Sequence, residues 1–227
     1  MKLWFSLGLI FSLPLVAHAD AAALVQEKCA ACHALAAPDF AASGVAERAQ
    51  RKAPPLYYAG NKFRPEWLAA WLQKPARIRP AGVFPAAHVQ STPKGDAVDP
   101  AALPAHPALP AAEAEAAAAY LMTLKPHDKL IQAENYEPKG ITARMGQMNF
   151  GKFKGCDGCH QDAPGRGGVS GPELHSAWQR LQPAFISAYI ANPTAWDPHS
   201  MMPGAELNAD AVHKLADYLK VIGEKQP

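Results

Sequence analysis

The sequence predicts an all-α chain in which two small helical units follow one another. A five-residue pattern, Cys-x-x-Cys-His, occurs at residues 29–33 and again at residues 156–160. Each copy is followed by amphipathic helical segments in the same order, which is typical of an internal repeat. Nothing in either unit has the alternation and turn signals of a hairpin, so no sheet is expected.

The repeated pattern is typical of covalent attachment of a c-type haem. On one turn of helix, both cysteine sulfurs can reach the two vinyl groups along one porphyrin edge and form thioethers. The histidine that follows then lies under the ring, where an imidazole nitrogen can bind the iron. The residues concerned are Cys29, Cys32 and His33 in the first copy and Cys156, Cys159 and His160 in the second. The sequence therefore predicts two covalently bound haem c groups.

The cysteine pairs have two other interpretations. A Cys-x-x-Cys pair can be a thioredoxin-like redox centre, or it can supply half of a zinc site. Here all four cysteines of the chain fall in the two pairs, and a histidine follows each pair directly. That combination favours haem attachment over both alternatives.

Residues 1–19 have the pattern of a cleaved signal peptide. Lys2 is followed by an apolar run at residues 3–16 that is too short to span a bilayer. Residues 17–19 read Ala-His-Ala, the small-x-small pattern that precedes cleavage, so the mature chain is expected to begin near Asp20. A retained N-terminal anchor is the alternative. Export to a bacterial periplasm also fits the cysteine pairs, and no further membrane span is expected after cleavage.

About 208 residues follow the expected cleavage site, enough for two small domains. The repeat divides them into a first domain at residues 20–125, a linker at residues 126–141 and a second domain at residues 142–227. The linker mixes charges with Pro138 and Gly140 and shows no helical periodicity. The formal net charge of +2 gives no case for nucleic-acid binding.

Helices are expected where apolar residues recur on one face between proline signals. They are predicted at residues 21–28, 65–73 and 110–124 of the first domain and at residues 183–191 and 208–222 of the second. Pro65 and Pro183 begin their helices, because proline is tolerated in a first turn. Pro75 and Pro193 follow the ends of the same helices.

Residues 80–110 contain seven prolines, a density that excludes helix or central strand. Composition alone would allow a disordered linker there. The segment lies before the last helix of the first domain, however, and an ordered loop is therefore expected.

These features resemble the class I cytochromes c, in particular tandem proteins with two mono-haem domains. The repeat pairs residues 67–75 with 185–193 and residues 109–121 with 207–219. The resemblance implies that each haem lies in a cleft of helices, with the first and last helices of the domain packed across each other. It also implies that a proline carbonyl orients the proximal histidine. That proline would be Pro172 for His160 and Pro55 for His33.

The resemblance also implies a sixth iron ligand in the second domain, where its methionine ligand directly precedes a proline. Met202 stands directly before Pro203, between the two later helices, and Met201 is the alternative. A methionine can also be ordinary core filling. His175 and His199 are nearby competitors for the iron.

The first domain departs from this pattern, because Phe84-Pro85 stands where Met202-Pro203 stands in the second. Phenylalanine cannot bind iron, so the sixth ligand would be His106 or His88. His106 directly precedes a proline, whereas His88 lies four residues after Phe84. The third option is an open iron shielded by Phe84.

The expected function is that of a periplasmic di-haem cytochrome c that transfers single electrons between respiratory redox partners. The partners are an electron donor and an electron acceptor, and the chain could be a subunit of a larger redox complex. The alternative is a haem enzyme whose open or weakly ligated first haem acts on peroxide or on a small sulfur or nitrogen compound. The sequence leaves the oligomeric state open.

Overall fold

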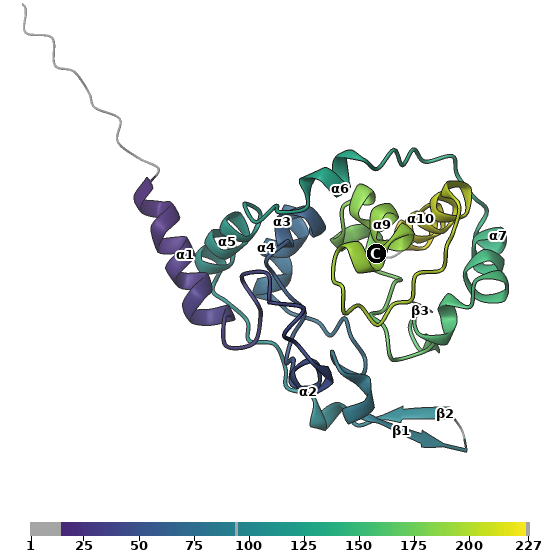
Figure 1. The fold of residues 1–227 in the computed structure, drawn as a ribbon, viewed down its shortest axis with the longest axis horizontal. Coiled ribbons are helices and arrows are strands. Elements are labelled where there is room, and N and C mark those ends of the chain that lie inside the picture. The colour runs from purple at the N-terminus through teal and green to yellow at the C-terminus, as the bar shows by residue number, and fades with distance from the viewer. Residues whose placement is uncertain (1–14, 94, 226–227) are drawn as a thin grey trace, which may run out of the picture.

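The computed structural model describes residues 15–93 and 95–225 (Figure 1). The expected signal peptide at residues 1–19 therefore lies mainly outside the described residues. No helix within the described part of the chain is long and apolar enough to cross a membrane. Helices make up most of the regular secondary structure of the described residues, which fits the all-α class predicted from the sequence.

The first unit consists of helices that surround a small apolar core. Its helices are α1 (Leu15–Cys29), α2 (Val45–Ala49), α3 (Ala59–Lys62), α4 (Pro65–Gln73) and α5 (Ala111–Leu121). Helix α4 begins at Pro65, as the sequence predicts, because a proline at N1 costs no hydrogen bond. Helices α1 and α5 pack against each other through Val25 and the buried face of α5, which includes Ala114 and Ala117. These small side chains let the two helices approach closely.

The second unit repeats this arrangement with larger side chains. Its helices are α7 (Ala143–Gln147), the π-helical η3 (Met148–Phe153), the 3-10 helix η4 (Cys156–Gly158), α8 (Ala177–Arg180), α9 (Pro183–Ala191), η5 (Pro193–Ala195) and α10 (Ala209–Gly223). The first helix, α7, crosses the last, α10, at Gly146. A Cβ at Gly146 would lie 2.2 Å from Cδ2 of Tyr218, so the crossing requires glycine.

Two features differ from the sequence-based expectation. The linker at 126–141 contains a short helix, α6 (Asp128–Gln132), which packs against α9. The expectation that neither unit contains a hairpin is wrong, because β1 (Val89–Thr92) pairs antiparallel with β2 (Gly95–Val98).

The hairpin fits between the prolines of the segment at residues 80–110. Pro85 and Pro100 lie in the flanking 3-10 turns η1 (Pro85–Ala87) and η2 (Pro100–Ala102), outside the paired residues. Each four-residue strand lies within a proline-free run, residues 86–92 or 94–99, so no ladder hydrogen bond is lost. A second, shorter ladder joins β3 (Gln161–Ala163) to β4 (Arg166–Gly167).

The two units meet along a pair of equivalent segments. Phe63 forms an antiparallel bridge with Leu181, and each of these residues stands two positions before the proline that begins α4 or α9. The amide of Arg64 donates to the carbonyl of Arg180 over 3.0 Å, and the amide of Gln182 donates to the carbonyl of Lys62 over 2.9 Å. The two bonds are equivalent, because Arg64 and Gln182 are 118 positions apart, and so are Lys62 and Arg180.

The side chains of Arg64 and Gln182 also form equivalent hydrogen bonds across the contact. Nε of Arg64 donates to the carbonyls of Trp178 and Leu181, both over 3.0 Å. Nε2 of Gln182 donates to the carbonyls of Gly60 and Phe63, both over 2.8 Å. The units are therefore related across their contact by an approximate two-fold axis, as in an isologous dimer.

Candidate cofactor-attachment sites

Both Cys-x-x-Cys-His copies form the same tight turn. In the first, the amides of Cys32 and His33 donate to the carbonyl of Cys29 over 3.1 and 2.9 Å. In the second, the amides of Cys159 and His160 donate to the carbonyl of Cys156 over 3.2 and 3.0 Å. No disulfide joins any of the four cysteines. The turn holds each cysteine pair and its histidine in one short segment, as covalent haem attachment requires.

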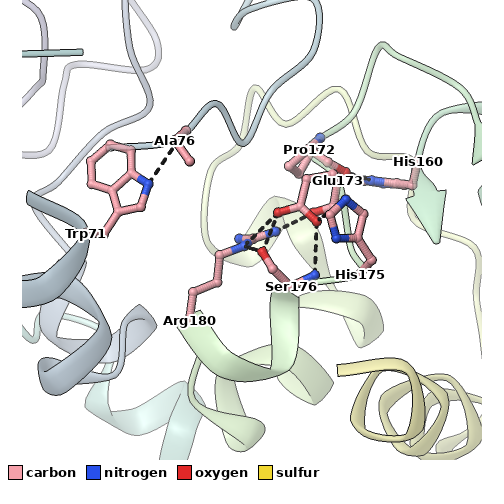
Figure 2. A network of polar contacts seen from close by, with 8 residues as sticks. All are labelled: Trp71, Ala76, His160, Pro172, Glu173, His175, Ser176 and Arg180. Atoms are coloured by element: carbon pink, nitrogen blue, oxygen red, sulfur yellow. Dashed lines mark hydrogen bonds and ion pairs between the residues drawn. The ribbon is translucent and has the colours of Figure 1, made fainter. Parts of the chain in front are cut away.

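Each motif histidine is oriented by a proline carbonyl. Nδ1 of His160 lies 2.7 Å from the carbonyl oxygen of Pro172, the proline predicted for it (Figure 2). Nδ1 of His33 lies 2.7 Å from the carbonyl oxygen of Pro54. A neutral imidazole that donates from Nδ1 keeps Nε2 as an acceptor, so both rings can bind iron through Nε2.

The proline at His33 is a correction to the prediction of Pro55. The two units keep a constant separation of 118 residues from this proline to the end of α4 and α9, which places Pro54 opposite Pro172. Because Pro54 and Pro55 are adjacent, the sequence offers two candidates, and the path of the chain selects the first. Gly171 precedes Pro172, and a Cβ there would lie 2.5 Å from the His160 ring. Glycine is therefore required for the ring to reach its carbonyl.

The cysteines do not have the environment of a redox pair. Burial raises the pKa of the Cys29 thiol, and burial together with the charge of Asp157 raises the pKa of Cys156 to about 11. A thioredoxin-like centre requires the opposite shift, toward a thiolate at neutral pH. Within the described residues, no group of three or more His, Cys, Asp or Glu side chains lies close enough together to hold a metal ion.

The structure brings His106 to His33. Their ring centres lie 6.1 Å apart. An iron bonded on opposite sides by two imidazoles, with metal–nitrogen bonds of about 2 Å, separates the ring centres by roughly 6 Å. Nδ1 of His106 lies 2.8 Å from the carbonyl oxygen of Pro107, which leaves Nε2 available. The residues present therefore fit a haem iron held between His33 and His106.

His88, the other candidate, is oriented elsewhere. Its ring lies beside Gly82, where an added Cβ would fall 3.3 Å from His88 Cδ2. Gly82 has a φ of 74°, a left-handed conformation that favours glycine. His88 and His33 are both described, and no contact between their rings is present. Of the two candidate histidines, His106 is the one whose ring lies near that of His33.

In the second unit, the segment with Met202 is held by Tyr189. The Tyr189 hydroxyl lies 3.1 Å from Oγ of Ser200, which accepts a hydrogen bond from the Met202 amide over 3.2 Å. Met202 is half-buried, whereas Met201 is 58% exposed. Tyr189 occupies the position of α9 that Trp71 occupies in α4, and the Trp71 ring lies 4.6 Å from that of His106. The same helix position thus supports the distal segment in both units.

The competing histidines have other partners. Nε2 of His175 lies 3.2 Å from Oε2 of Glu173, in the polar network around Arg180 (Figure 2). The His199 ring packs edge-on against Phe40 with centres 5.5 Å apart. Neither contact involves the segment of Met202 or the ring of His160.

A cavity of about 320 Å³ beside the first motif includes a contribution from the other unit. It is lined by Cys32, His33, Tyr57 and Arg51, and also by Asp197 of the second unit. Nη1 of Arg51 lies 2.9 Å from Oδ2 of Asp197, and the Tyr57 hydroxyl donates to the carbonyl of Trp196 over 3.0 Å. These residues were not predicted from the sequence, although the constant separation of 118 residues could have indicated that equivalent segments of the two units face each other.

Comparison with known proteins supports the cytochrome c family for the first unit. Residues 18–125 match the family model described as Cytochrome c. No curated protein and no solved structure matches the chain. The family match supports covalently bound haem c with iron, an all-α fold and a haem-based electron carrier in general. The second Cys-x-x-Cys-His motif lies outside the matched residues.

Proposed function

We propose that this chain is a di-haem cytochrome c that carries single electrons between respiratory redox partners. The observation that carries the proposal is the repetition of one geometry. Pro54 and Pro172 each offer a carbonyl at 2.7 Å to Nδ1 of a motif histidine, with Nε2 left free. The family match covers the first site, and the second repeats its attachment turn and its proximal contact.

The two haems would have different axial ligands. The first has His33 and His106, and the second has His160 and Met202. A bound haem supplies reversible one-electron chemistry at its iron, and methionine raises the potential of that iron relative to a second histidine. The first haem is then the entry site at lower potential, and the second is the exit site at higher potential.

The contact between the units supports transfer within the chain. Hydrogen bonds between Arg64, Gln182 and their partner carbonyls hold the units in one arrangement. Buried rings of both units join there, with Tyr58 and Phe185 at 6.3 Å and Tyr58 and Trp196 at 5.8 Å. Electrons would therefore pass from one haem to the other without a separate docking step.

Location and partners form the remainder of the proposal. Cleavage after residue 19 would release the chain into the periplasm, where donor and acceptor proteins dock transiently. The chain could equally serve as a subunit of a larger redox complex. The alternative of an enzyme with an open first iron gains no support, because a candidate ligand, His106, lies near His33 with ring centres 6.1 Å apart.

The test combines haem counting with a redox titration. Alkaline pyridine spectra against protein mass give the number of haems per chain, with Cys29→Ser/Cys32→Ser and Cys156→Ser/Cys159→Ser as matched variants that each lose one haem. The expected result is two haems per chain and two low-spin one-electron steps at separate potentials. A single haem in the intact chain, or two equal potentials, contradicts the proposal.

A further inference from the structure

A segment of the second unit that leads toward Met202 is contacted by the first unit. The Tyr57 hydroxyl donates to the carbonyl of Trp196 over 3.0 Å. Nη1 of Arg51 lies 2.9 Å from Oδ2 of Asp197. Both partners in the second unit are buried, with Trp196 1% and Asp197 7% exposed. The first unit therefore supplies a hydrogen bond and a positive charge to the segment that precedes the proposed iron ligand.

Asp197 is the residue that organises this segment. Its Oδ1 accepts a hydrogen bond from the amide of His199 over 2.9 Å, and its carbonyl accepts one from the amide of Ser200 over 2.8 Å. The other carboxylate oxygen, Oδ2, is the one that faces Arg51. An aspartate that accepts from the amide two residues further on closes a turn of the backbone. The orientation of the Asp197 carboxylate therefore sets the path of residues 197–200.

The end of this turn holds the backbone of Met202. Oγ of Ser200 accepts a hydrogen bond from the Met202 amide over 3.2 Å, and it lies 3.1 Å from the Tyr189 hydroxyl. Polar contacts thus run without interruption from the Arg51 guanidinium, through Asp197 and Ser200, to Met202. The contacts begin in one unit and end at the distal segment of the other.

The first unit lacks both polar residues of this turn. At the separation of 118 residues, the counterpart of Asp197 is Arg79, and a guanidinium cannot accept a hydrogen bond. The counterpart of Ser200 is Gly82, which has no hydroxyl. The counterpart of the methionine is Phe84, which cannot bind iron. The polar turn therefore accompanies the methionine and is missing where the methionine is missing.

We propose that Arg51 and Asp197 are positioning residues for Met202, so that the first unit completes the distal site of the second haem. The inference rests on the proposed function, because it needs a haem at the second motif with Met202 as its ligand. Methionine has a flexible, unbranched side chain, so its position at an iron depends on a fixed backbone. A buried carboxylate needs a countercharge, and Arg51 supplies it from the other unit.

The inference predicts that loss of the Arg51 charge loosens Met202 on the iron. Residues that orient a metal ligand typically contribute about 10- to 100-fold to binding of the metal. Because added imidazole must displace the methionine, Arg51→Gln should raise the affinity of the oxidised second haem for imidazole about tenfold. Arg51→Lys should reverse part of this change, since lysine keeps the positive charge.

The experiment is an imidazole titration of the oxidised, haem-loaded full chain. Loss of the near-infrared absorption band that reports sulfur ligation of ferric haem measures the binding. The second haem is the one with a proposed sulfur ligand, so this band reports on that site.

The matched control is Lys52→Gln, which removes the same charge one position along the chain. Lys52 is exposed and lines the same cavity, and within the described residues it forms no ion pair with Asp197. Tyr57→Phe is a second test variant, because it removes the other contact with the segment. Its effect should have the same direction and be smaller, since a neutral hydrogen bond is weaker than a charged one. Urea unfolding of each variant measures its stability separately.

The outcomes distinguish failure of this inference from failure of the proposed function. An unaltered chain without the sulfur band refutes Met202 as the ligand of the second haem, and the inference with it. With the band present, equal imidazole affinities in Arg51→Gln and Lys52→Gln overturn the positioning role and leave the proposed function intact.

A structural role for the ion pair has a different signature. If Arg51→Gln is less stable in urea but binds imidazole like the unaltered chain, the pair only joins the units and the inference is overturned. If Arg51→Gln does not fold with both haems, Tyr57→Phe decides, and an unchanged imidazole affinity in that variant overturns the inference.

Discussion

The first and second units share their proximal sides and differ on their distal sides. Both use a tight motif turn and a proline carbonyl at 2.7 Å from Nδ1 of the histidine. On the opposite side, the first unit places His106 against His33, whereas the second carries Met202 in a segment held by Tyr189. The comparison shows that attachment is a local property of each motif. The proposed distal ligand depends instead on a segment distant in the chain.

The units also differ at equivalent positions of their contact. Arg79 and Asp197 are counterparts, separated by the constant 118 residues, and they carry opposite charges. Ile78, the residue before Arg79, accepts a hydrogen bond from the amide of Glu173 in the second unit, and Asp197 lines the cavity beside the first motif. An approximate two-fold arrangement therefore gives the two haem sites different electrostatic surroundings. The difference in charge and the proposed difference in axial ligands both favour a higher reduction potential at the second site.

The largest expected effect is loss of a distal ligand. His106→Ala should convert the first haem from low-spin to high-spin and make it bind added cyanide or azide, because its iron loses one of two strong ligands. Met202→Ala should do the same to the second haem only. Electron paramagnetic resonance of the oxidised protein measures both changes. His88→Ala is the matched control, and a spin change in that variant with none in His106→Ala would refute the assignment.

The next largest effect is a difference in stability between the α7/α10 crossing of the second unit and the α1/α5 crossing of the first. Gly146→Ala should destabilise the chain by about 2–3 kcal/mol, since the added methyl would collide with Tyr218 and overpacking costs amounts of this size. In the first unit, Ala21 is a buried residue of α1, and Ala21→Gly should cost only about 1 kcal/mol, the loss of helix propensity. Urea unfolding of the haem-loaded protein measures both. Equal costs would mean that the crossings are packed alike.

A smaller effect is expected from the ion pair that joins the units. Arg51→Gln should cost about 1–2 kcal/mol, because Asp197 is buried and loses its charged partner. The double variant with Asp197→Asn should recover part of this loss. A double-mutant cycle from urea unfolding measures the coupling. Additive single effects would show that the pair does not stabilise the contact.

The smallest effect is an alkaline loss of stability at Tyr57. Burial, followed by the charge of Asp197, raises the pKa of Tyr57 from 10.0 to about 12 in the folded protein. The unfolded chain then releases this proton first, so its stabilising contribution is complete below pH 10 and is lost as the pH rises toward 12. At pH 11 the loss is about 1 kcal/mol. Tyr57→Phe should flatten the decline in unfolding free energy between pH 9 and 11, and an unchanged slope would contradict this prediction.

Helix positions were largely predictable because their signals are local. Pro65 and Pro183 begin α4 and α9, and the helices end before Lys74 and Asn192 as expected. Short elements were harder to predict from the sequence. The linker helix α6 and the hairpin of β1 and β2 have weak local patterns, and their pairing depends on neighbours that the sequence does not identify.

Residue types and short spacings are enough to identify the two attachment motifs, the helical repeat and the absence of a methionine at the position of Met202 in the first unit. Each of these depends on residue type and short spacing, which local chain geometry converts directly into structure. The folded chain is needed to show that Pro54 rather than Pro55 contacts His33, and that the ring of His106 rather than that of His88 lies near it. Pro54 is 21 positions from His33 and His106 is 73 positions from it, so both contacts depend on the path of the chain in between. They also depend on the contact between units, which brings Arg79 and Asp197 to opposite sites and which no local pattern encodes.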